Sequence, residues 1–218
     1  MIALTYGMIT NIDDRIGMVM NTLKSCGADK NTVVVFTADH GDLMGDHGIV
    51  LKGPLHYQGL VRVPFIWRDP SAAAASSADA PAARRDDLVS SIDLPATILA
   101  RAGISAPNGS QGKALFDTVG EALPSGRDAV LIEENQQRAY MGFKNAVSVR
   151  TLVTNRHRLS VFQEGDWGEL YDLQNDPHEI NNLWDEAEAE SIKSALLLRL
   201  VRAQIEHAET SPNPTRIA

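Results

Sequence analysis

Cysteine and long hydrophobic runs are nearly absent from this chain. Among its 218 residues, Cys26 alone is a cysteine, so no disulfide can form within the chain, as is usual in reducing compartments. No stretch of about 18 apolar residues is present to span a membrane, and the N-terminus lacks the basic segment and apolar core of a secretory signal. We therefore expect a cytoplasmic protein that does not bind membranes.

Positive charge is also scarce. The chain has 20 Lys and Arg residues against 28 Asp and Glu residues, which gives a net charge of −8. This balance argues against a nucleic acid as partner, because a phosphate backbone is bound by clustered positive charge. A small anionic substrate is still compatible with it, because a bound metal and one lysine can reverse the field locally.

Hydrophobic periodicity predicts both helices and strands. An N-terminal helix is expected to have one apolar face, made by Ile9, Ile12, Ile16, Val19 and Leu23. Two more helices are expected over residues 87–102, with the regular part starting at Asp93, and over residues 191–206. Strands are expected at 61–67, 129–132, 146–153, 159–162 and 168–173. The last four strands follow one another without a helix, which predicts a small antiparallel sheet.

The stretch from residue 32 to residue 52 carries the strongest chemical signal. Residues 32–37 are β-branched and aromatic, which is typical of a parallel strand buried on both faces. Asp39, His40 and Gly41 follow, where α/β sheets bind ligands, and a carboxylate and an imidazole can coordinate a divalent cation there. Lys52 could meet an anionic substrate beside this cation. An ordinary surface turn with solvated charges is the alternative that these residues leave open.

Several short motifs follow one another in a fixed order along the chain. They are Thr37-Ala38-Asp39-His40-Gly41-Asp42, Gly45-Asp46-His47-Gly48, Lys52-Gly53, Arg62-Val63-Pro64-Phe65-Ile66, Glu169-Leu170-Tyr171-Asp172-Leu173, Asp176-Pro177-His178-Glu179 and Asn182-Leu183. This ordered set resembles the C-terminal half of the sulfatase family, within the alkaline phosphatase-like superfamily. The resemblance runs from about residue 6 to about residue 190, so it covers most of the chain.

The resemblance implies a metal-dependent hydrolysis of sulfate esters. It assigns Asp39 and His40 as ligands of a divalent cation, which is usually calcium, with manganese or zinc as alternatives. Lys52 matches the lysine that contacts the sulfate and steadies the leaving oxygen of a small anionic ester. His56 is a further catalytic candidate, although a histidine there is more often a packing or hydrogen-bonding residue. A histidine at position 40 resembles the phosphonate monoester hydrolase branch, so a phosphonate or phosphodiester hydrolase is the alternative.

The chain departs from the family pattern at the nucleophile. The family makes a formylglycine from Cys or Ser in Cys-x-Pro-x-Arg, whereas Cys26 stands in Ser-Cys-Gly-Ala-Asp and Ser105 stands in Ser-Ala-Pro-Asn-Gly, which lacks the arginine. The family's two N-terminal aspartate ligands have no counterpart either. We therefore expect a truncated C-terminal portion that binds metal weakly and is inactive without the missing half. A non-catalytic fragment that self-assembles through an exposed sheet edge is the alternative.

The expected fold class is α/β. The resemblance implies the C-terminal part of an alkaline phosphatase-like parallel or mixed sheet flanked by helices, together with the small antiparallel sheet and its packed C-terminal helix. Residues 1–127 would form the remainder of the large domain, with a loop or linker near residues 71–85. Residues 128–209 would form the small subdomain, and residues 210–218 a tail.

Overall fold

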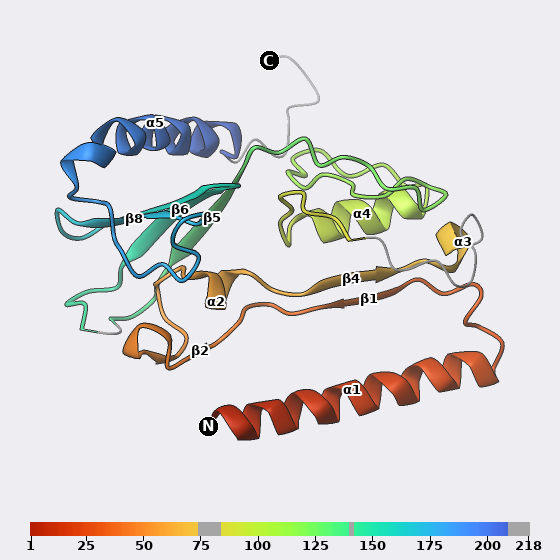
Figure 1. Cartoon of the computed structure of the whole chain (residues 1–218). Coiled ribbons are helices and arrows are strands. Elements are labelled where there is room, and N and C mark those ends of the chain that lie inside the picture. The colour runs from red at the N-terminus through yellow and green to blue at the C-terminus, as the bar shows by residue number, and fades with distance from the viewer. Residues whose placement is uncertain (74–83, 140–141, 209–218) are drawn as a thin grey trace, which may run out of the picture.

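The computed structural model describes residues 1–73, 84–139 and 142–208 (Figure 1). It is a mixed α/β structure, as expected, in which the N-terminal elements and a C-terminal sheet with its helix form two neighbouring parts. Most of the expected linker near residues 71–85 and the whole of the tail at 210–218 lie outside the described residues. The division of the chain between residues 127 and 128 stays a prediction.

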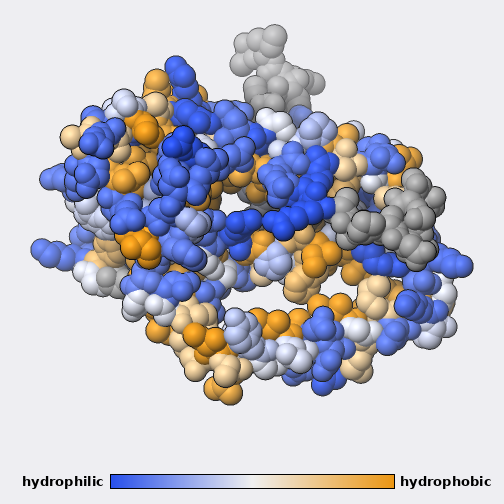
Figure 2. Space-filling model, in the orientation of Figure 1, coloured by the Kyte–Doolittle hydropathy of each residue, from blue (hydrophilic) through white to orange (hydrophobic). Residues whose placement is uncertain are grey.

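The N-terminal helix is confirmed and is longer than expected. Helix α1 spans Ile2–Ser25, and Gly27 follows it with φ 71°, as a glycine that ends a helix does. None of its residues is buried, and Ile12 and Val19 on the expected apolar face are 51% and 56% exposed. Figure 2 shows hydrophobic side chains along this helix and an opening between it and the rest of the molecule. The apolar face is therefore largely exposed, with Ile16 and Leu23 half-buried.

The strand before Asp39 is present, but its surroundings differ from the expectation. Strand β1, Val34–Thr37, pairs antiparallel with β4, Phe65–Arg68, and it is only partly buried. The run of β-branched residues predicts the strand correctly. The expected burial of β1 would require a second neighbouring strand, and among the described residues β1 pairs with β4 alone. Strand β4 begins later than expected because helix α2, Gln58–Val61, and Pro64 precede it.

A short hairpin occupies the stretch that the sequence indicated only as a polar loop. Strand β2, Leu43–Met44, pairs antiparallel with β3, Val50–Leu51, and the 3-10 turn η1, Asp46–Gly48, forms its tip. Leu43 is fully buried against Tyr57, Leu60 and Tyr171. This small hydrophobic cluster fixes the hairpin on the body of the molecule.

The C-terminal strands and helix confirm the expected small antiparallel sheet with a packed helix. Strands β5, Ala129–Asn135, β6, Ser148–Thr154, β7, His157–Phe162, and β8, Gly168–Asp172, form a sheet in the order β5-β6-β7-β8. The turn η2, Ala187–Ala189, leads into α5, Glu190–Glu206, which covers one face of the sheet (Figure 1). The core between them is made by Leu152, Leu159, Leu170, Ala189, Leu196 and Leu200.

Buried ion pairs hold the segment between these two parts. The short helix α3, Pro70–Ala73, follows Asp69, whose carboxylate pairs with Arg101 at the end of α4, Asp93–Arg101. Asp93 is the first residue of α4, as expected, and its fully buried carboxylate pairs with Arg127. Among the described helices, none is both long and apolar enough to cross a membrane.

Arg158 connects the sheet to the N-terminal part. Its side chain is fully buried and pairs with Glu169 on β8 and with Glu179 in the loop after β8. The other carboxylate oxygen of Glu179 accepts a hydrogen bond of 2.7 Å from the backbone N–H of Gln58, the first residue of α2. A buried charge is costly unless it is paired, so this cluster requires the two parts to lie together.

We predict that Glu179→Ala lowers the free energy of unfolding by about 3 kcal/mol, because it leaves the buried Arg158 with one carboxylate fewer. The matched control is Glu133→Ala, which breaks the half-exposed pair with Arg150 and should cost less than about 1 kcal/mol. Urea denaturation followed by circular dichroism measures both values. Equal losses in the two variants would contradict the role assigned to Glu179.

Candidate active site

The base of the β2–β3 hairpin brings together Asp39, His40 and Lys52. Because the two strands pair antiparallel, the residues before β2 and after β3 return to the same end of the hairpin. The Lys52 Nζ lies 2.8 Å from the His40 Nε2, and this nitrogen lies 3.7 Å from an Asp39 carboxylate oxygen. The carboxylate, the imidazole and the ammonium that the sequence singled out thus share one place on the surface.

The hydrogen bonds of His40 determine which of its ring nitrogens carries the proton. Its Nδ1 lies 2.7 Å from the carbonyl oxygen of Gly41, which can only accept a hydrogen bond, so Nδ1 carries the proton. The Nε2 lone pair of the neutral ring then accepts a hydrogen bond from the Lys52 ammonium. A neutral imidazole held by a backbone carbonyl in this way is the form that coordinates metals.

Gly41 is held in place by the segment that follows the hairpin. Its N–H donates to the carbonyl oxygen of Leu60 at 2.7 Å. A Cβ at this position would come within 2.0 Å of the Gly59 carbonyl oxygen, so no larger residue fits. The close contact between Gly41 and α2 therefore sets the direction from which His40 presents Nε2.

Asp39 is more exposed than His40. Its side chain is 87% exposed, and its Oδ1 accepts a 2.9 Å hydrogen bond from the backbone N–H of His40. That hydrogen bond, together with the nearby Lys52 ammonium, lowers the pKa of the Asp39 carboxyl. Asp39 is therefore ionised at neutral pH and available as a ligand for a cation.

His56 lies in a different environment from these three residues. It is buried, its Nδ1 lies 2.8 Å from the Thr151 hydroxyl on β6, and its Nε2 lies 2.7 Å from a Glu134 carboxylate oxygen on β5. Its hydrogen bonds join the segment after Lys52 to the C-terminal sheet. They favour the hydrogen-bonding role of His56 over the catalytic one.

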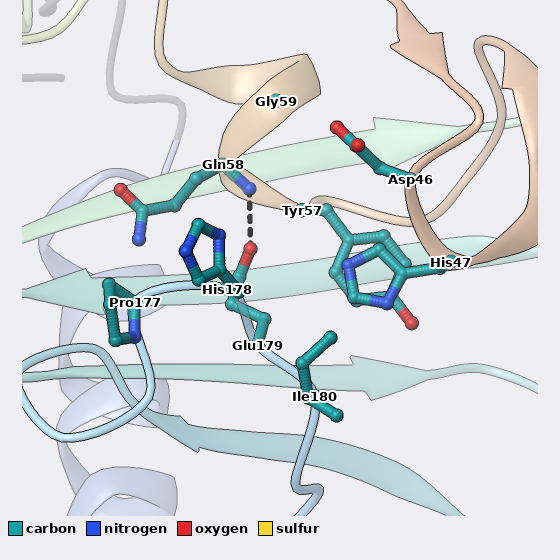
Figure 3. A pocket seen from close by; sticks show the side chains of 9 residues that line it. All are labelled: Asp46, His47, Tyr57, Gln58, Gly59, Pro177, His178, Glu179 and Ile180. Carbon is teal, nitrogen blue, oxygen red and sulfur yellow. Dashed lines mark hydrogen bonds between the residues drawn. The ribbon is translucent and has the colours of Figure 1, made fainter.

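The structure brings together two further motifs of the sequence, Gly45-Asp46-His47-Gly48 and Asp176-Pro177-His178-Glu179. They face each other across a cavity of about 270 Å³ at the tip of the hairpin (Figure 3). Both motifs carry a histidine and a carboxylate in a loop, and this shared composition was the signal that could have indicated a site. Their meeting could not be inferred, because about 130 residues separate them in the chain.

Asp39 and His40 are the metal ligands that the resemblance implies. Within the three described ranges, no group of three or more His, Cys, Asp or Glu residues is placed to hold a metal ion. The assignment of Asp39 and His40 as ligands stays a prediction.

Comparison with known families identifies the family of this chain. The sequence model of the family described as N-sulphoglucosamine sulphohydrolase, C-terminal, matches residues 45–206. The chain belongs to this family. The matched range includes Lys52 and both motifs that line the cavity, whereas Asp39 and His40 lie just before it. The sulfatase resemblance of the sequence motifs is thereby confirmed.

Individual relatives extend the likeness to nearly the whole chain. The chain is 32% identical to an arylsulfatase of Clostridium perfringens over 82% of its own length and 34% of the relative's. It is 27% identical to an N-acetylglucosamine-6-O-sulfatase of Bacteroides thetaiotaomicron over 93% of its length and 35% of the relative's. The crystal structure of a phosphonate monoester hydrolase of Agrobacterium radiobacter, at 25% identity, matches 98% of this chain and 43% of that chain with a TM-score of 0.83. The chain thus spans about a third of the length of these curated relatives.

Proposed function

We propose that the chain supplies the cation- and anion-binding residues of a sulfatase-type ester hydrolase site. One observation carries this proposal: the Lys52 ammonium lies on the Nε2 lone pair of His40, next to the ionised carboxylate of Asp39. One end of the hairpin thus combines two groups that can bind a cation, Asp39 and His40, with a positive charge, Lys52, that can bind an anionic substrate. Membership of the family supports sulfate esters as the substrate class.

The donor set fits a divalent cation. The structure already places a positive charge, the Lys52 ammonium, against His40 and beside Asp39. Calcium suits the carboxylate, whereas manganese and zinc also accept imidazole, so the three ions are all candidates. When bound, such a cation supplies Lewis-acid stabilisation of the negative charge on the non-bridging oxygens of the ester. Two protein donors alone give a weak site.

The residues of this chain divide the remaining tasks between them. Asp39 stays ionised because the His40 N–H holds its carboxylate. The Nε2 of His40 is unprotonated because the proton of the ring is on Nδ1, which donates to the carbonyl oxygen of Gly41. Lys52 moves from Nε2 to the ester oxygens, where its ammonium stabilises the charge that develops on the leaving group. No residue of the sequence stands in a Cys-x-Pro-x-Arg context, so none is assigned as nucleophile.

A phosphonate monoester or phosphodiester hydrolase is the second enzymatic candidate. The histidine at position 40 and the likeness to the Agrobacterium radiobacter hydrolase favour it. The same ammonium and cation suit both ester classes, since each bears negative charge on its non-bridging oxygens. Rates on sulfate and phosphonate esters, measured with a longer version that carries the nucleophile, separate the two candidates.

Self-association is a candidate of another class. The apolar face of α1 is largely exposed, and β1 has a pairing partner on one edge only within the described part of the chain. Apolar surface and an open strand edge are features that pair with another chain. We propose a second copy of this chain as the partner.

The first prediction for the site concerns its affinity for a metal ion. Lys52→Met should bind Mn²⁺ about tenfold more tightly than the wild type, because no ammonium then competes for the His40 lone pair. This change corresponds to about 1.4 kcal/mol of binding free energy. Asp39→Asn should weaken binding. Isothermal titration calorimetry measures these affinities, and Lys24→Met, in the last turn of α1, is the matched control. Unchanged or weaker binding by Lys52→Met would contradict the assignment.

The second prediction concerns catalysis by this chain alone. The purified chain with saturating Ca²⁺ or Mn²⁺ should not hydrolyse 4-nitrophenyl sulfate above the rate in buffer, because it lacks the motif that forms the nucleophile. Release of 4-nitrophenol is followed by absorbance. Turnover that persists through purification and disappears in Asp39→Ala would show instead that the chain carries its own nucleophile.

The third prediction concerns the state of association. The chain should form a dimer in the absence of metal, as measured by sedimentation velocity over a range of concentrations. The double variant Ile12→Lys and Val19→Lys should be monomeric, because it charges the apolar face of α1. Ile205→Lys, at a residue of α5 that is 70% exposed, is the control and should stay dimeric. A monomeric wild type rules the second copy out.

A further inference from the structure

His56 belongs to a series of hydrogen-bonded side chains that crosses the C-terminal sheet. Its side chain is only 3% exposed, and its two ring nitrogens contact Thr151 and Glu134. The Thr151 hydroxyl lies 2.7 Å from the hydroxyl of Ser160, the residue opposite it on strand β7. The Ser160 oxygen accepts a hydrogen bond of 2.7 Å from Nη1 of Arg158. A continuous series of hydrogen bonds thus connects the buried guanidinium to the Glu134 carboxylate.

The protons that each group carries determine the direction of these hydrogen bonds. The guanidinium of Arg158 can only donate, so the Ser160 oxygen accepts. The Ser160 hydroxyl has one proton, and within the described ranges the Thr151 oxygen is the acceptor left for it. The Thr151 hydroxyl then donates its own proton to Nδ1 of His56. Nδ1 is therefore unprotonated, whereas Nε2 carries the ring proton and donates to the Glu134 carboxylate.

The opposite direction would leave a buried hydroxyl without an acceptor. If Nδ1 of His56 donated to Thr151, the Thr151 proton would point to Ser160. The Ser160 proton would then have no acceptor among the residues that the structure describes. Both hydroxyl-bearing residues are fully buried, where an unmade hydrogen bond is unfavourable. His56 is thus held as the Nε2–H tautomer, the reverse of His40 in the candidate site.

The segment between Lys52 and His56 is buried, although Lys52 itself is exposed. Gly53 and Pro54 are buried, and Leu55 packs against two separate hydrophobic clusters. His56 follows and is joined by its two hydrogen bonds to β5 and β6. Lys52 is therefore the exposed end of a stretch of chain that is fixed to the C-terminal sheet.

The position of the Lys52 ammonium depends on this stretch. A lysine side chain has many rotamers, so the backbone must be held if its ammonium is to occupy one place. The Lys52 Nζ lies 2.8 Å from the Nε2 of His40. On one side, the pairing of β2 with β3 holds the backbone before Lys52. On the other side, the hydrogen bonds of His56 hold it, and they lead back to Arg158.

We infer that His56 is a positioning residue for Lys52. As the Nε2–H tautomer between Thr151 and Glu134, it keeps the buried segment in the place from which the Lys52 ammonium meets the His40 lone pair and an anion. This inference rests on the proposed function for the role of Lys52. It adds to the site a residue that touches neither the cation nor the anion.

The tautomer of His56 is the first test, and it is measured on the wild-type chain. NMR of the chain labelled with ¹⁵N in histidine distinguishes the two neutral tautomers and the imidazolium by their ring nitrogen shifts. The His56 signals are those that disappear in His56→Gln. We expect an unprotonated Nδ1 and a protonated Nε2 at neutral pH. A proton on Nδ1 of His56 overturns the inference.

The affinities for a cation and for an anion show whether His56 acts through Lys52. His56→Leu releases the segment, so the ammonium moves away from His40. Calorimetry should show about threefold tighter binding of Mn²⁺ and, for the Mn²⁺-loaded chain, about fivefold weaker binding of 4-nitrophenyl sulfate. A general loss of structure would weaken both. His56→Gln should keep both affinities within about twofold of the wild type, because its amide accepts from Thr151 and donates to Glu134.

A double-mutant cycle separates positioning from an independent effect. In the Lys52→Met background, His56→Leu should change neither affinity further, because no ammonium is left to position. Thr151→Val should change the two affinities in the same directions as His56→Leu. Thr154→Val is the matched control, because it removes another buried hydroxyl of β6, one that donates to the His157 carbonyl oxygen. It should leave both affinities unchanged.

The outcomes distinguish this inference from the proposed function. Weaker binding of both ligands by His56→Leu, or the same effect of His56→Leu with and without Lys52, overturns the inference. If His56→Leu does not unfold cooperatively in urea, Thr151→Val takes its place in the cycle. If Lys52→Met changes both affinities and His56→Leu changes neither, the inference fails and the proposed function stands. If Lys52→Met changes neither, the proposed function fails, and the inference fails with it.

Discussion

The buried charge of Arg158 is the constraint on which the rest of the structure depends. Its guanidinium is shielded from water and lies between Glu169 and Glu179, above the rings of Tyr57 and Tyr171. Burying one charge without partners costs several kcal/mol, so strands β7 and β8, the loop after them and the start of α2 can only fold together. The Asp176-Pro177-His178-Glu179 motif thus has a physical reason: it returns a carboxylate to a buried arginine.

The ion pairs of Arg158 are linked to His40 by a series of hydrogen bonds. Glu179 holds the N–H of Gln58, and two residues further on the backbone of Leu60 holds Gly41. Gly41 in turn fixes the ring of His40 through its carbonyl oxygen. On the other side of the hairpin, His56 anchors the segment after Lys52 to β5 and β6. The ring of His40, in the proposed site, is therefore oriented by hydrogen bonds that begin in the interior of the C-terminal sheet.

Local patterns in the sequence predicted the helices and strands. They did not predict the contacts between segments that are distant in the chain. The alternation around Val149 and the spacing from Leu196 to Leu200 indicated β6 and α5 because each depends on neighbours along the chain. The partners of His56 lie 78 and 95 residues away, so its role could not be read from its own loop. The partial burial of β1 depends on strands beside it and not on its own composition.

The two parts of the chain differ in how they achieve stability. The C-terminal sheet and α5 enclose a core of leucines such as Leu159 and Leu196. Helix α1 contributes no buried residue, so its apolar face adds little to the stability of the described part of the chain. An apolar face at regular helical spacing stabilises a helix only when another surface covers it. Asp39 lies two residues after the end of β1. A surface that covered the open edge of β1 would therefore lie close to Asp39.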